Sequence, residues 1–225
     1  MNKEIFFIYI DILGFEQLPR ELAEQSKFDE DWIRQFAFLS PFRQIIQDLH
    51  HDKDVIIDHL KEEADSCSFL THDLDSLFKI INKFSHISLP TKIGEIETVP
   101  IEVGIDYVNN QKELCVDPIA SQKIISSLKK NFFGIYRQWF KTQNHDSIKR
   151  SYIIISESVY QKLKNHQKRD CEKLPIKDQD LFLLPSAIVD REKEIHDFLS
   201  TIGKSRSDAS GAYIDKIFGL CRIPQ

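Results

Sequence analysis

Residues 5–15 constrain the fold of this chain more than any other part of its sequence. Six apolar or aromatic residues precede Asp11, a pattern typical of a strand that is covered on both faces of a sheet. Gly14-Phe15 then predicts a turn into a helix. An ionised carboxylate at the end of a buried strand is costly unless a cation or hydrogen-bond donors compensate it. Asp11 is therefore a candidate metal ligand, and capping of the following turn is the simpler alternative.

The bulk composition is that of a folded, weakly acidic protein. With 225 residues, 41% of them hydrophobic and 29% charged, the chain is long enough for one large domain, or one domain with an appended subdomain. The net charge of −5 gives no general attraction to nucleic acid. Nucleic acid is therefore not an expected partner, although a local basic patch leaves it open.

The cysteines and the apolar runs indicate the expected compartment. The 4 cysteines are widely separated, so their spacing indicates neither a zinc site nor a disulfide framework. No apolar run approaches the length of ~20 residues that a membrane helix needs. We expect a cytoplasmic protein with reduced thiols and no membrane association.

Hydrophobic periodicity predicts alternating strands and helices. Strands are expected at residues 4–13, 55–57, 68–70, 101–107, 152–155, 181–184 and 187–189. Helices are expected at 16–25, from 29 onward with a restart capped at Ser40-Pro41, at 73–84, from 117 over the longest helical stretch, at 156–163 and at 192–202. This order predicts an α/β sandwich, of the α+β type, with a mixed sheet.

A second carboxylate strengthens the case for a metal site. Asp65 lies in an acidic cluster, Glu62-Glu63-Ala64-Asp65-Ser66, directly before a short apolar run. Two aspartates on neighbouring strands can hold one or two Mg²⁺ ions, which prefer oxygen ligands and keep positions open for phosphate oxygens and water. Turn formation by Asp65-Ser66 is the alternative.

Together these segments resemble the class III nucleotide cyclase catalytic domain, most like the short bacterial and archaeal cyclase-like proteins. The family's first strand often reads Asp-Ile-Leu-Gly-Phe, which stands here at residues 11–15. The stretches Val103-Gly104-Ile105 and Ile154-Ile155-Ser156-Glu157-Ser158-Val159-Tyr160 are similar to later family motifs. The resemblance spans roughly residues 4–165.

The resemblance implies a fold and a reaction. The fold would be a ferredoxin-like palm over residues 1–165, with residues 166–225 as a C-terminal extension packed on it. Asp11 and Asp65 would be the catalytic metal ligands for Mg²⁺ (or Mn²⁺), joined by the Ile12 carbonyl. Leu13, Gly14 and Phe15 would cradle phosphate at a helix N-terminus. The substrate would be a nucleoside triphosphate, whose 3′-hydroxyl attacks its α-phosphate, and a homodimer would complete the site.

Several positions differ from the family's pattern. Ala64 stands where the family normally has glycine, and Asp106-Tyr107 follows the Val103-Gly104-Ile105 strand. The late asparagine and arginine of the family have no clear counterpart, and the stand-ins by location are Asn144, Lys149, Arg150 and Arg137. Some of these belong to a basic cluster, Lys129-Lys130, Arg137, Lys141, Lys149 and Arg150, which is expected to be the exposed face of an amphipathic helix.

Two other functions stay open. A metal-dependent nuclease would use Asp65 or Asp106 with Glu102 and a lysine such as Lys112, because Glu102 and Asp106 alternate along one strand and can face one side. A non-catalytic nucleotide-sensing or interaction module would use the aspartates only as caps.

Overall fold

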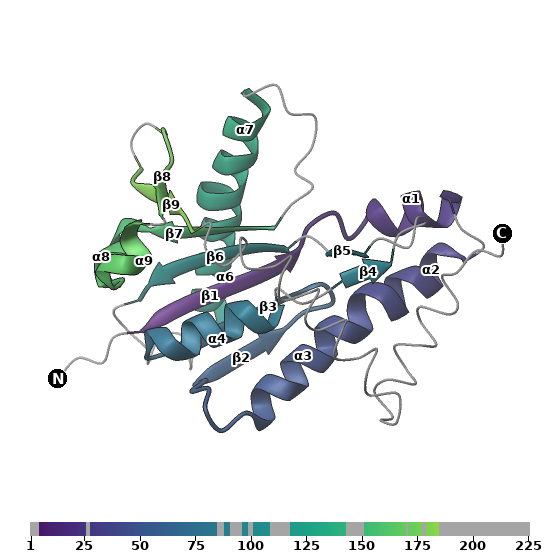
Figure 1. Ribbon diagram of the computed structural model, residues 1–225, viewed down its shortest axis with the longest axis horizontal. Coiled ribbons are helices and arrows are strands. Elements are labelled where there is room, and N and C mark those ends of the chain that lie inside the picture. The colour runs from purple at the N-terminus through teal and green to yellow at the C-terminus, as the bar shows by residue number, and fades with distance from the viewer. Residues whose placement is uncertain are drawn as a thin grey trace.

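Strand β1 (Phe6–Ile12) lies inside the sheet and is almost entirely buried, as its unbroken apolar run predicts. The computed structural model describes residues 5–25, 28–84, 88–90, 96–98, 101–108, 118–142, 151–169, 171–176 and 179–184. Within these ranges a seven-stranded sheet has the order β2-β3-β1-β6-β7-β9-β8. Helices pack on both of its faces, so the prediction of an α+β protein with a mixed sheet is confirmed (Figure 1).

The first part of the sheet has the connectivity of a ferredoxin-like fold. Strand β2 (His59–Glu62) pairs with β3 (Ser66–Thr71), β3 with β1, and β1 with β6 (Ile101–Tyr107), and every pair is antiparallel. Helices connect β1 to β2 and β3 to β6, so each connection passes over one intervening strand. This βαββαβ arrangement confirms the expected palm.

Three further strands extend the sheet beyond β6. Strand β7 (Tyr152–Ser156) is parallel to β6, and β9 (Leu181–Leu183) is antiparallel to both β7 and β8 (Glu172–Lys173). The described part of the C-terminal extension thus belongs to the same sheet. Strands β4 (Ser88–Pro90) and β5 (Ile96–Thr98) form a separate pair. The strand and helix expected at 187–189 and 192–202 lie outside the described residues.

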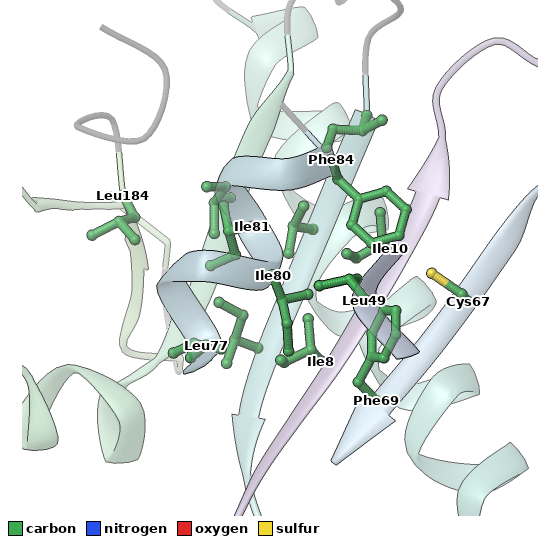
Figure 2. Close-up of a cluster of buried hydrophobic side chains, with 14 of the residues drawn as sticks. Ile8, Ile10, Leu49, Cys67, Phe69, Leu77, Ile80, Ile81, Phe84 and Leu184 are labelled. Atoms are coloured by element: carbon green, nitrogen blue, oxygen red, sulfur yellow. The ribbon is translucent and has the colours of Figure 1, made fainter. Parts of the chain in front are cut away.

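The first face of the sheet is covered by the helices that precede β2 and by α4. These are α1 (Leu18–Gln25), α2 (Glu30–Ile33), the π-helical η1 (Arg34–Leu39), α3 (Ser40–His51) and α4 (Leu74–Phe84). Figure 2 shows how Leu77, Ile80 and Phe84 of α4 point toward the sheet and meet Ile8, Ile10 and Phe69 from β1 and β3. The spacing of these apolar residues, three and four apart, produces one continuous core face on α4.

The second face is covered by one long helical run. It consists of α6 (Pro118–Leu128), the π-helical η2 (Lys129–Gly134) and α7 (Ile135–Thr142), in agreement with the predicted long helix. Its apolar residues pack against Phe7, Tyr9 and other residues that alternate with those of the first face. At Gly104 a Cβ atom would lie 3.2 Å from the Phe133 ring, so the missing side chain allows η2 to approach the sheet closely.

Two short helices follow β7. Helix α8 (Glu157–Lys162) is capped by Ser156, whose hydroxyl accepts a hydrogen bond from the Val159 N–H, and α9 (Asn165–Arg169) comes next. This hydrogen bond satisfies an N–H group in the first turn of the helix that was expected at 156–163. None of the helices in the described ranges combines the length and apolarity needed to cross a membrane.

Two local predictions are wrong. Residues 55–57 are not a strand, because the Ile56 N–H is held by the Ser76 hydroxyl of α4, and pairing with β3 starts only at His59. Ser40 does not restart a helix, because its N–H bonds to the Gln35 carbonyl within a continuous helical run. The wide π-helical turn before Pro41 accommodates a residue that lacks an N–H donor.

Candidate functional site

Asp11 lies on the second face of the sheet, at the end of β1. Its neighbours Ile10 and Ile12 enter the core of the first face, whereas Tyr9 belongs to that of the second, so strand alternation directs Asp11 to the second face. In register, Asp11 lies opposite Ser66 on one side and Glu102 on the other. Directly opposed residues of an antiparallel pair share a face, so two carboxylates meet here.

Glu102 is compensated by two donors. The Arg137 guanidinium of α7 and the Tyr152 hydroxyl of β7 each donate a hydrogen bond to a different oxygen of its carboxylate. The Glu102 side chain is only 2% exposed, whereas that of Arg137 is 45% exposed. A buried carboxylate requires such donors, and the neighbouring carboxylate raises the pKa of the Tyr152 hydroxyl beyond the increase that burial causes. The Glu102 network is therefore a fixed part of the site.

Asp11 is compensated less completely. Burial, followed by the charges of Glu102 and Asp65, raises the pKa of the Asp11 carboxyl to about 7, although the Lys129 charge opposes this increase. The Lys129 Nζ atom lies 3.9 Å from Asp11 Oδ2, a loose ion pair with a half-exposed lysine. The end of β1 is therefore a place where additional positive charge would be stabilised.

Asp65 lies in the turn that joins β2 and β3. Its carbonyl accepts a hydrogen bond from the Ile12 N–H at 3.0 Å, and the Glu63 N–H donates to the Ser66 carbonyl at 2.8 Å and closes the turn. The Glu63 carboxylate accepts hydrogen bonds from Lys61 Nζ at 3.0 Å and from the Ser66 hydroxyl at 3.3 Å. These contacts hold the backbone of Asp65 beside the end of β1. The two segments with candidate metal ligands, around Asp11 and Asp65, therefore lie next to each other at the same end of the strands.

The residues expected to cradle phosphate form the turn after Asp11. Gly14 has a φ angle of 76°, which glycine adopts without strain, and its carbonyl accepts hydrogen bonds from the N–H groups of Gln17 and Leu18. Helix α1 therefore begins three residues beyond Phe15. The Phe15 ring packs edge-on against Phe38, so Leu13, Gly14 and Phe15 form a turn before the helix and not its first turn.

The donor set at the end of β1 suits a hard divalent cation. Carboxylate and carbonyl oxygens are the ligands that Mg²⁺ prefers, and it is commonly held by one or two carboxylates with phosphates and water completing its shell. The Tyr9 hydroxyl lies buried beside Asp11, and its pKa is raised by burial and by the Asp11 charge. No cluster of three or more His, Cys, Asp or Glu side chains able to hold a metal occurs in the residues that the structure describes.

Some sequence-derived candidates have other roles or lie elsewhere. The Asp106 carboxylate accepts a hydrogen bond from the Tyr107 N–H, and Glu102 is held by Arg137 and Tyr152. Lys112, Asn144, Lys149 and Arg150 lie outside the described residues.

Two members of the basic cluster lie on the exposed face of the helical run, as expected, and also reach the sheet. Lys129 and Arg137 are half exposed, but each contacts a carboxylate of the sheet. Sequence analysis also missed Tyr9 and Tyr152 as parts of the site. Strand alternation could have indicated Tyr9, which is two residues from Asp11 and so shares its face.

Comparisons with known proteins were made at the levels of family, sequence and structure. No protein-family model matches the chain, and no curated protein matches it. Solved structures similar to it include the guanylate cyclase domain of RhGC from Catenaria anguillulae in complex with GTP, at 12% identity and a TM-score of 0.42, covering 81% of this chain and 96% of that one. The adenylyl cyclase CyaB from P. aeruginosa has 13% identity and a TM-score of 0.42, covering 81% and 93%. The adenylate cyclases from Trypanosoma brucei have 9% identity and a TM-score of 0.41, covering 83% and 91%.

Proposed function

We propose that this chain is a cyclase-like protein that binds a nucleoside triphosphate together with Mg²⁺ or Mn²⁺ at the end of β1. Asp11, Asp65 and the Ile12 carbonyl would hold the metal, and the turn Leu13–Phe15 would lie against the phosphates. The observation that carries the proposal is the position of the largely buried Asp11 carboxylate, opposite Glu102 and paired only loosely with Lys129 at 3.9 Å. A dication bound there would reverse this unfavourable charge balance.

The reaction we propose is formation of a cyclic nucleotide. A bound divalent metal would supply Lewis-acid stabilisation of the charge that develops on the α-phosphate. This chain's own residues would position the substrate, Asp11 and Asp65 through the metal. A second copy of the chain is part of the proposal, because the resembled family often completes its site across a dimer.

The binding test uses the two aspartates and an exposed control. Asp11→Ala and Asp65→Ala should each abolish the metal-dependent thermal shift produced by ATP or GTP while the protein remains folded by circular dichroism. Asp75→Ala is the matched control, because the Asp75 side chain is 77% exposed on α4. Unchanged nucleotide-induced shifts in both site variants would contradict the site assignment.

The catalytic test separates turnover from binding. Incubation with ATP or GTP and Mn²⁺, followed by chromatography, should yield a 3′,5′-cyclic nucleotide and pyrophosphate with the wild-type protein and none with Asp11→Ala. Binding of ATP or GTP without formation of a cyclic nucleotide would instead indicate a nucleotide-sensing module. Mg²⁺-dependent cleavage of plasmid or RNA that is lost in Glu102→Ala would instead favour the nuclease.

A further inference from the structure

Lys129 occupies a defined position over the end of β1. It is the first residue of η2, directly after Leu128, whose buried side chain anchors this part of the helix near Gly104 on the sheet. From there its Nζ atom lies 5.1 Å from the centre of the Tyr9 ring and 3.9 Å from Asp11 Oδ2. Contacts with an aromatic face and a carboxylate hold the ammonium group at the site itself.

The neighbouring cations are engaged elsewhere. Arg137 is paired with Glu102, and Lys61 Nζ donates to Glu63 at 3.0 Å and to Gln122 at 2.9 Å. Across the ranges that the structure describes, Lys129 is the one cationic side chain within 4.0 Å of an Asp11 carboxylate oxygen. The charge balance of Asp11 in the unliganded chain therefore depends on this lysine.

A divalent ion and this ammonium group would repel each other. Mg²⁺ bound to the Asp11 carboxylate would lie ~2.1 Å from an oxygen atom, and so within a few ångströms of Nζ in its present position. Like charges at such separations destabilise one another even at the edge of a protein. The Lys129 side chain is 48% exposed, so it can move into solvent when a divalent ion binds the Asp11 carboxylate.

We propose that Lys129 is the resident counter-ion of Asp11 and competes with divalent metal for that carboxylate. This inference rests on the metal site of the proposed function. Metal binding in the absence of nucleotide then requires displacement of the lysine, so the intrinsic metal affinity is set by a residue that is not itself a metal ligand. Removing a half-exposed cation should therefore strengthen metal binding.

The experiment measures binding of Mn²⁺ alone, without nucleotide, by calorimetry and by the electron paramagnetic resonance signal of free Mn²⁺. Lys129→Met should tighten Mn²⁺ binding about tenfold, as expected for loss of one neighbouring like charge. Lys129→Arg should keep the weak wild-type affinity. Lys130→Met is the matched control, because Lys130 is the adjacent exposed lysine, and it should behave as wild type.

Each outcome bears on the proposal. Mn²⁺ binding that is unchanged or weakened in Lys129→Met, with the variant folded by thermal unfolding, overturns the competition. Asp11→Asn should lose Mn²⁺ binding. If it does while Lys129→Met shows no tightening, the metal site stands and the competition fails. If Asp11→Asn binds Mn²⁺ as wild type does, the metal site and the competition both fail.

Discussion

Asp11 and Glu102 lie opposite each other on β1 and β6, and the chain compensates their charges very differently. Glu102 accepts hydrogen bonds from Arg137 and Tyr152, whereas Asp11 has a lysine at 3.9 Å. One carboxylate of the pair is therefore held by two hydrogen-bond donors, and the other has only a loose ion pair.

The pH dependence of stability should reveal the buried Asp11 charge. Its pKa of about 7 in the folded chain lies above the ordinary value of ~3.9 expected when unfolded, so the folded state binds more protons between these values. The free energy of unfolding due to this group therefore falls as pH rises from about 4 to 7. At pH 8, with a chelator present, Asp11→Asn should be more stable than wild type by up to about 4 kcal/mol.

Urea unfolding at pH 8 and at pH 4 checks this prediction. Most of the gain in Asp11→Asn should disappear at the lower pH, where the wild-type carboxyl is protonated in the folded state and about half protonated in the unfolded state. Asp75→Asn, at a mostly exposed position, should show no comparable gain. A variant that is equally stabilised at both pH values would contradict the assignment to the Asp11 charge.

The Glu102 network should behave as a coupled unit. Arg137→Met leaves a buried carboxylate with one donor fewer and should lower the free energy of unfolding by about 3 kcal/mol. Adding Glu102→Gln should recover part of this loss, because the buried charge is then gone. The control is Arg43→Met, since Arg43 and Glu62 form an exposed pair at 3.5 Å that should contribute less than about 1 kcal/mol. Strictly additive losses in a double-mutant cycle would argue against the network.

Gly104 should be intolerant of a larger side chain. A Cβ atom at residue 104 would lie 3.2 Å from the Phe133 ring. Gly104→Val should therefore force η2 away from the sheet and lower the free energy of unfolding by about 1–3 kcal/mol. Gly134→Ala is the contrasting variant, because its added Cβ would meet only the Lys129 carbonyl at 3.4 Å and alanine favours helix. Chemical denaturation of both proteins tests the packing, and equal stability of Gly104→Val and wild type would refute it.

The N-cap of α4 should contribute measurably to stability. The Asp73 carboxylate accepts a hydrogen bond from the Ser76 N–H at 2.7 Å, so Asp73→Ala should lower the free energy of unfolding by about 1 kcal/mol. Asp75→Ala, in the same helical turn but mostly exposed, should have a much smaller effect. Thermal unfolding of the two variants provides the comparison. Equal melting temperatures of Asp73→Ala and Asp75→Ala would show that the cap does not stabilise the protein.

Elements with strong local signals were predictable, and those that depend on distant contacts were not. The strand at 101–107 and the helix starts near residues 29 and 156 follow from apolar runs and from side chains that bond nearby N–H groups. The predicted strand at 55–57 failed because a hydrogen bond from Ile56 to Ser76, 20 residues away, overrides a short β-forming run. The restart at Ser40 failed because a π-helical turn admits Pro41 without a break.

For the candidate site, the sequence by itself determined that Asp11 ends a buried strand and that Asp65 lies in an acidic turn, because both facts depend on neighbouring residues. The tertiary structure alone decided that Glu102 would face Asp11 and that Arg137, Tyr152 and Lys129 would supply the compensating groups. These partners come from three elements that meet only when the helical run α6–α7 packs on the sheet. The burial and the charge balance of a side chain depend on all the groups around it, including those distant in sequence. No local sequence pattern could therefore have identified the residues that compensate these two carboxylates.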